Sequence, residues 1–246
     1  MSAPRVAIVT GSSSGIGEGI ARGLTGDGWT VVVNSATSVD AGEKLAAELP
    51  GASYVQADIA DPADAVRLVE TAVARHGRLD LLVNNAGVSR PVPHADLDAV
   101  TPGDWHRILG VNVVGTWQVS VAAVKAMEPG GQIINITSVG GSRPLGSSIP
   151  YAVSKAAVDH MTRLLAKAVG PDVRVNAIAP GPLRTRLTSA SLAARAERTA
   201  AMTPLGRIGE PPDIAAVVLA LTRTPFVTGE VINVDGGINL VTHMDA

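Results

Sequence analysis

Short runs of apolar, mostly β-branched residues recur along the chain, and each is followed by a segment long enough for a helix. Runs that do not alternate with polar residues are typical of parallel strands buried on both faces. The regular alternation of strand and helix predicts a doubly wound, Rossmann-like α/β sheet of about seven strands with helices on both faces. The expected strands are 6–9, 31–33, 54–56, 79–83, 133–136, 173–178 and 231–234.

Length and composition favour one domain over residues 1–246. We find no composition break, low-complexity tract or repeat, and 46% hydrophobic against 17% charged residues argues against disorder. A chain of this length buries about 70–75% of its unfolded surface, so its core needs no disulfide or metal. The absence of cysteine excludes disulfides, thiolate catalysis and cysteine-ligated metals.

Charge, hydropathy and histidine spacing bear on the partners, the cellular location and the metal content of the protein. The formal net charge is -2 and the basic residues are scattered, so we expect no nucleic-acid partner. No signal-peptide pattern and no apolar run near the ~20 residues of a membrane span are apparent, so we expect a cytoplasmic protein without a membrane segment. The five histidines lack metal-ligand spacing, so we expect no metal site.

A glycine-rich turn follows the first expected strand and opens a helix. Glycine lets the backbone turn sharply, and a helix N-terminus presents free N–H groups to a phosphate. The spacing is G-x-x-x-G-x-G and is not that of a P-loop. The turn therefore predicts a dinucleotide diphosphate site, while tight packing of strand on helix is the alternative. The candidate residues are Gly11, Ser13, Ser14, Gly15, Ile16 and Gly17.

The end of the second strand bears on the choice of cofactor. A carboxylate there would hold the ribose of NAD and repel a 2′-phosphate. The chain has Asn34 and Ser35 and no carboxylate before Asp40, which favours NADP(H) over NAD(H). An ordinary polar turn would suit either cofactor. After the third strand, Asp58 is a candidate for the adenine amino group, or for a helix cap together with Asp61.

Several further motifs appear in a fixed order: Asn84-Asn85-Ala86-Gly87, Asn112, Ser138, Tyr151 with Lys155, Pro180-Gly181, and 234–237. With the glycine turn, they make the chain resemble the short-chain dehydrogenase/reductase family over essentially its whole length. The resemblance implies a catalytic tetrad of Asn112, Ser138, Tyr151 and Lys155. It also implies a mobile substrate lid near 183–205, and cofactor contacts at Ile59, Asn85, Ala86, Gly87, Tyr151, Lys155, Pro180, Gly181, Leu183 and Thr185.

The tyrosine and lysine make chemical sense as a pair. Four residues apart, they share one face of a helix. An ammonium within ~4–6 Å of a phenol lowers its pKa by about 1–3 units, toward the range that a general acid or base needs. Ser138 would hydrogen-bond the substrate oxygen. The alternative is a surface pair on an amphipathic helix.

We therefore expect an NADP(H)-dependent oxidoreductase that moves hydride between nicotinamide and a small-molecule carbonyl or secondary alcohol. The first alternative is a 3-oxoacyl-[acyl-carrier-protein] reductase, although 127–131 and 170–172 lack the basic residues that would dock an acidic carrier; Lys125, Arg163 and Lys167 lie near them. The second is a non-catalytic nucleotide sensor, which the intact Tyr151 and Lys155 argue against. By resemblance we expect a homo-tetramer built on the Tyr151 helix and the C-terminal strand.

Overall fold

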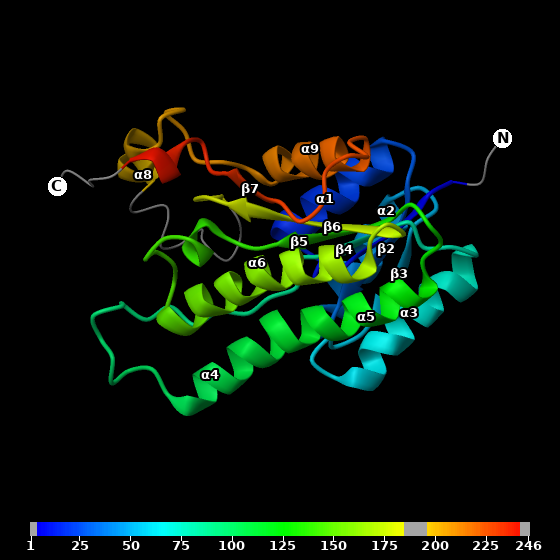
Figure 1. Cartoon of the computed structure of the whole chain (residues 1–246), viewed down its shortest axis with the longest axis horizontal. Helices are drawn as coiled ribbons and strands as arrows, with labels where there is room; N and C mark the ends of the chain where they lie inside the picture. The colour runs from blue at the N-terminus through cyan, green and yellow to red at the C-terminus, as the bar shows by residue number, and fades with distance from the viewer. Residues whose placement is uncertain (1–3, 185–195, 242–246) are drawn as a thin grey trace.

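Seven parallel strands form one sheet in the order β3-β2-β1-β4-β5-β6-β7 (Figure 1). The computed structural model describes residues 4–184 and 196–241. All seven expected strands are present, and the fourth begins two residues later than its apolar run. The strands are β1 (Val6–Val9), β2 (Thr30–Ser35), β3 (Ser53–Gln56), β4 (Leu81–Asn84), β5 (Gly131–Ile136), β6 (Val173–Pro180) and β7 (Val231–Val234).

Helices cover both faces of this sheet, as the alternation predicted (Figure 1). One face carries α1 (Gly15–Gly26), α2 (Val39–Glu48) and α9 (Pro211–Thr222). The other face carries α3 (Pro62–His76), α5 (Thr116–Ala126) and α6 (Ile149–Val169). Within the described residues, the remaining elements are α4 (Pro102–Leu109), the π-helix η1 (Gly110–Gly115), the short 3-10 helices η2 (Val139–Gly141) and η3 (Ile238–Leu240), and α8 (Ala196–Met202).

The central strands explain why the apolar runs are unbroken. In β1, Ala7 and Val9 pack in the core beneath α1 and α9. Val6 and Ile8 pack in the opposite core, beneath α3 and α5. Successive strand side chains point to opposite faces, so a strand covered on both sides needs an apolar residue at every position.

The switch in strand order lies between β1 and β4. Strand β1 pairs with β2 on one side and with β4 on the other. In such sheets a crevice opens at the carboxyl ends of the strands at this switch point, and ligands bind there. The glycine turn after β1 and the Asn-Asn-Ala-Gly run after β4 both lie at this place.

One finding differs from the hydropathy expectation. The continuous helical stretch Pro102–Ala126 has 25 residues and a mean hydropathy of 1.3, enough by length and composition to cross a membrane. In the fold, however, this stretch packs beside α3 and α6 as part of the layer below the sheet. Its apolar character is that of a core helix of a soluble protein.

Candidate active site

The turn after β1 forms a close-fitting cradle. Gly11 and Gly15 have φ of 61° and 60°, a region that favours glycine. A Cβ on Gly17 would lie 2.6 Å from the carbonyl oxygen of Gly11. Helix α1 begins at Gly15, and the side chain of its N-cap residue Ser14 makes no capping hydrogen bond. The first-turn N–H groups and the Ser14 hydroxyl are therefore available to an anion, which fits a dinucleotide diphosphate.

Hydrogen bonds connect the cradle, residues 11–17, and the preceding Thr10 to the end of β4. The Thr10 hydroxyl oxygen accepts hydrogen bonds from the backbone N–H groups of Asn85 and Ala86, each at 3.0 Å. The Asn85 amide donates to the carbonyl oxygens of Thr10 and Gly11 at 2.9 and 3.0 Å. The Asn85 side chain thus holds the turn in shape. The sequence pattern indicated Asn85 and Ala86 as site residues but not Thr10, whose partners lie more than seventy positions away.

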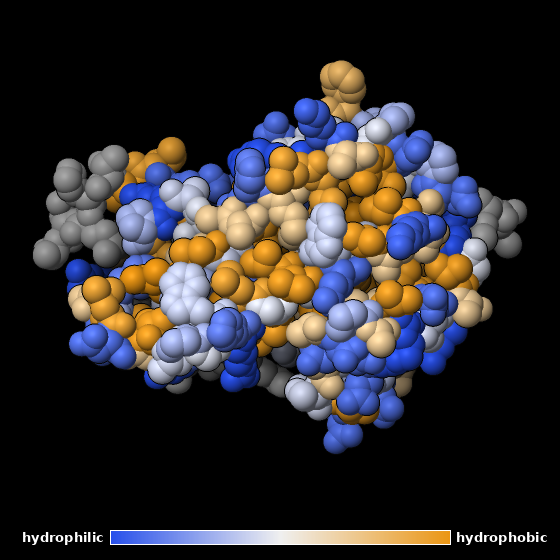
Figure 2. Space-filling view, turned by 60° about the horizontal axis from the view of Figure 1, so that its bottom comes forward, coloured by the Kyte–Doolittle hydropathy of each residue, from blue (hydrophilic) through white to orange (hydrophobic). Residues whose placement is uncertain are grey.

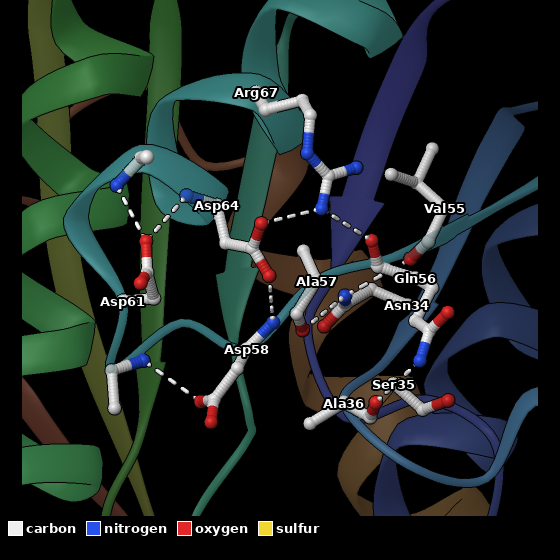
Figure 3. A network of polar contacts seen from close by, with 12 residues as sticks. Asn34, Ser35, Ala36, Val55, Gln56, Ala57, Asp58, Asp61, Asp64 and Arg67 are labelled. Carbon is white, nitrogen blue, oxygen red and sulfur yellow. Dashed lines mark hydrogen bonds and ion pairs between the residues drawn. The ribbon is translucent and has the colours of Figure 1, made fainter.

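The polar side chains at the end of β2 do not point to a phosphate as donors, as the sequence had led us to expect. The Asn34 amide donates to the carbonyl oxygens of Val55 and Ala57, both at 3.1 Å (Figure 3), and its Oδ1 accepts from Gly11 N–H at 3.2 Å. Asn34 is 1% exposed, so both amide hydrogens are already used inside the protein. The Ser35 hydroxyl is paired with the Tyr54 hydroxyl at 2.8 Å. Ala36 is the first exposed residue after β2.

The structure separates the two aspartates after β3. Asp61 caps α3, because its carboxylate accepts from the N–H groups of Ala63 and Asp64 (Figure 3). Asp58 lies before the helix, and its Oδ1 accepts from Ala60 N–H at 3.0 Å. The exposed Asp58 carboxylate is therefore no helix cap and stays a candidate for the adenine. Ile59 is buried, and a Cβ on Gly115 would lie 2.9 Å from it.

Ser138, Tyr151 and Lys155 meet at the carboxyl end of β5. Ser138 follows this strand, and Tyr151 lies in the first turn of α6, where the two hydroxyls are within hydrogen-bond reach of each other. Lys155 is one turn further along α6. Its Nζ lies 5.7 Å from the centre of the Tyr151 ring and donates to the carbonyl oxygen of Ile136 at 2.9 Å. Lys155 is 6% exposed, so the tyrosine and lysine are no surface pair.

The electrostatics of this pair correct one prediction. We expected Lys155 to lower the pKa of Tyr151, but desolvation raises the pKa of this phenol above its usual value, while the Ser138 hydrogen bond acts against the rise. The ammonium lies beside the ring and is held by a backbone carbonyl. Burial also lowers the pKa of Lys155 to about 8. Near neutral pH, Tyr151 is therefore a protonated acid.

Asn112 lies in the π-helix η1, and such π-turns are frequent at functional sites. Its amide donates to Val88 O at 3.0 Å and to the Ser154 hydroxyl at 2.9 Å, and its Oδ1 accepts from Val88 N–H at 2.8 Å. These bonds tie η1 to α6 and to the loop after β4. A Cβ on Gly87 would lie 3.2 Å from Asn112 Oδ1 and 3.6 Å from Lys155 Nζ, so this loop passes directly over the site.

The segment after β6 completes the described surroundings. Pro180 ends the strand, and a Cβ on Gly181 would lie 2.7 Å from the Cα of Asp235. Leu183 is 6% exposed and pairs with Gly209 in an isolated bridge. Thr185 lies outside the described residues, as does the part of the expected 183–205 lid that runs from 185 to 195. Among the residues that the structure describes, no three histidine or acidic side chains gather as metal ligands would.

Comparison with known proteins agrees with this geometry. The family model described as Enoyl-(Acyl carrier protein) reductase matches residues 11–239. The "Granaticin polyketide synthase putative ketoacyl reductase 2" of Streptomyces violaceoruber is 56% identical over 240 residues, covering 96% of each chain. The 3-oxoacyl-[acyl-carrier-protein] reductase of Thermotoga maritima is 37% identical over 244 residues, covering 95% of this chain and 97% of its own.

Solved structures extend the agreement to three dimensions. A short-chain dehydrogenase/reductase from Brucella melitensis has a TM-score of 0.91 at 32% identity, covering 95% of this chain and 96% of its own. The Pseudomonas aeruginosa RhlG/NADP complex has a TM-score of 0.87 at 33% identity, covering 96% of each chain. With a nucleotide cradle at the switch point and paired tyrosine and serine hydroxyls beside it, this chain belongs to the short-chain dehydrogenase/reductase family, as a nicotinamide-dependent oxidoreductase of carbonyl and alcohol substrates.

Proposed function

We propose that the protein is an NADP(H)-dependent ketoreductase that reduces a keto group on an acyl or polyketide chain. The observation that carries the proposal is the Ser138–Tyr151 hydroxyl pair, set at the carboxyl end of β5 with the Lys155 ammonium beside it. The raised pKa of Tyr151 favours the reductive direction, because a protonated phenol is ready to donate. The ketoacyl reductase relative supports the substrate class.

Each residue of the tetrad has a role that its surroundings support. Ser138 binds the substrate oxygen and stabilises the charge that develops there. Tyr151 donates its proton to that oxygen, and Lys155 stabilises the phenolate that remains. Asn112 holds η1 against α6 and the loop after β4, which keeps the region around Lys155 in place.

The candidate cofactor-binding residues would hold successive parts of the dinucleotide along the carboxyl edge of the sheet. The cradle 11–17 would bind the diphosphate, Ser35 and Ala36 the adenosine ribose, and Asp58 with Ile59 the adenine. Residues 85–87 and 180–183, together with Tyr151 and Lys155, would surround the nicotinamide. When bound, the cofactor supplies the hydride that the substrate carbon receives.

The preference for NADP(H) rests on the end of β2, where no carboxylate stands. Ala36→Asp would place one at the first exposed position, where it repels a 2′-phosphate and accepts from ribose hydroxyls. We expect the ratio of kcat/KM for NADPH over NADH to fall by at least about tenfold, or ~1.4 kcal/mol. The neutral isostere Ala36→Asn is the matched control and should leave the ratio nearly unchanged; an equal fall in both variants would contradict the charge argument.

The activity itself is tested by following NADPH and NADH oxidation at 340 nm with simple ketones, β-ketoesters and a β-ketoacyl thioester. We expect turnover with NADPH and preference for the β-keto substrates. Turnover with NADH alone would reject the cofactor assignment. A second candidate, reduction of carrier-bound 3-oxoacyl groups, is supported by the Thermotoga relative, and a gain in kcat/KM for carrier-bound over free thioesters would favour it.

The proposed assembly is a cytoplasmic homo-tetramer of single-domain chains. Apolar side chains gather on the helical face shown in Figure 2. Of the exposed apolar residues on the helices, Val114 just before α5 and Trp117 within it are each 47% exposed, and Leu164 on α6 is 57% exposed. Strand β7 lies at the sheet edge, close in sequence to the fully exposed Phe226. Exposed apolar faces and open edge strands are typical of subunit contacts. Light scattering after size exclusion tests the tetramer.

A further inference from the structure

A buried carboxylate lies one helical turn beyond Lys155. Asp159 is 7% exposed and follows Lys155 by four residues, so both lie on the inner face of α6. Aspartate is almost never this buried unless it is paired. Its Oδ1 nevertheless has no hydrogen-bond partner among the described residues. A buried carboxylate oxygen without a hydrogen-bond partner is costly, so its presence one helical turn from Lys155 needs an explanation.

Asp159 also touches the loop that carries Ser138. A Cβ on Gly141, at the end of η2, would lie 2.6 Å from Asp159 Oδ2 and 3.0 Å from the carbonyl carbon of Lys155. Gly141 N–H in turn donates to Ser138 O at 2.8 Å. The Thr137 hydroxyl lies within hydrogen-bond reach of both the Asp159 carboxylate and Ile178 O. Asp159 thus lies where the strand end, the Ser138 loop and the Lys155 helix meet.

The opposite charges of Lys155 and Asp159 partly offset the cost of burying each of them. Desolvation lowers the pKa of Lys155 to about 8, and the attraction of Asp159 acts in the opposite direction. Desolvation raises the pKa of Asp159, while Thr137, Arg163 and Lys155 act to lower it. Of the described charged groups, the two that act on this carboxylate are Lys155 and Arg163, both on α6. Two uncharged residues face the Asp159 carboxylate from the neighbouring elements. They are Thr137, which directly follows strand β5, and Gly141, at the end of η2.

We propose that Asp159 is a positioning residue that keeps Lys155 in its ammonium form and seats the Ser138 loop on α6. The proposal rests on the proposed roles of Tyr151 and Lys155. Its consequence is a reductase that stays active at mildly alkaline pH, because the ammonium that stabilises the Tyr151 phenolate keeps its proton there.

The direction of the pH effect follows from the sign of the charge. Removing the carboxylate in Asp159→Asn removes an attraction that favours the ammonium, so Lys155 loses its proton at lower pH. A nearby opposite charge is worth about one pKa unit or more. The alkaline limb of kcat should move by about that amount, which at pH 8 is about a fivefold loss. At pH 6 Lys155 is protonated in both proteins, so kcat should differ little.

Lysine NMR measures this directly, without cofactor or turnover. The chain has four lysines, Lys44, Lys125, Lys155 and Lys167, so ¹³C-labelled lysine gives a simple spectrum. A Lys155→Met variant assigns the resonance of interest. We expect a wild-type Lys155 midpoint near pH 8, a lower midpoint in Asp159→Asn, and partial return in Asp159→Glu. Asp172→Asn removes an exposed carboxylate beyond the end of α6 and should leave the midpoint unchanged.

A Lys155 midpoint that is the same in Asp159→Asn and wild type would overturn the proposal. If the Asn variant does not fold, Asp159→Ser replaces it, because the smaller side chain also removes the carboxylate charge, and the Lys155 midpoint should fall by a similar amount. No change there would also overturn the proposal. A shifted midpoint together with full activity of Tyr151→Phe would reject the proposed function while leaving the coupling of Asp159 to Lys155 intact.

Discussion

Tyr151→Phe should reduce kcat for ketone reduction by about a thousandfold, while the fold and cofactor binding remain intact. General acid catalysis is worth about 10²–10⁴ in rate, and this variant removes the only proton that Tyr151 can give. Phenylalanine keeps the ring, so the change in packing is small. Steady-state kinetics with NADPH and a β-ketoester, with cofactor affinity from fluorescence titration, would measure both effects.

The chain offers a matched control, because it has two tyrosines. Tyr54→Phe also removes one hydroxyl, which is paired with Ser35 at 2.8 Å on the far side of the cradle from Ser138. We expect this variant to alter KM for the cofactor by a few-fold at most and to keep kcat. Undiminished turnover in Tyr151→Phe would reject the general-acid role, and an equal loss in both variants would indicate a structural effect.

Gly17→Ala should destabilise the protein and weaken cofactor binding together. The added methyl group would lie 2.6 Å from both Gly11 O and the Asn85 amide nitrogen, in the space where the turn after β1 meets the end of β4. Overpacking costs about 1–3 kcal/mol, and each hydrogen bond lost from Asn85 adds ~0.5–1.5 kcal/mol. Since alanine improves helix propensity by ~1 kcal/mol, we expect a net loss of about 2 kcal/mol.

Thermal unfolding and NADPH titration would check this prediction. For a chain of this size, about 2 kcal/mol lowers Tm by about 4–8 °C. Gly26→Ala is the matched control, because it lies at the other end of α1 and its added methyl group meets nothing within 4 Å. This control should be neutral or slightly stabilising. Equal Tm values for the two variants would contradict the steric argument, because they would mean that a methyl group fits at Gly17.

Local sequence was enough to predict the architecture and the main candidates for the site. Unbroken apolar runs predicted the strands, because a strand covered on both faces must be apolar at every position. The glycine turn predicted the cradle, because the backbone conformations of Gly11 and Gly15 favour glycine. The four-residue spacing of Tyr151 and Lys155 predicted a shared helix face, since the helix repeat is itself a local property.

Tertiary structure decided how these side chains are used. Asn34 was expected to face a phosphate, yet the ends of β1 and β3 take both of its hydrogens and its oxygen. The pKa of Tyr151 rises instead of falling, because the effect of burial outweighs that of the Ser138 hydroxyl, while the Lys155 ammonium is held by Ile136 O. Thr10 gave no sequence signal, because its partners lie more than seventy positions away. Asp159 gave none, because its burial depends on Thr137 and Gly141 in the segment after β5. Desolvation and hydrogen-bond partners depend on which segments meet in space, and the spacing of residues along the chain does not determine that.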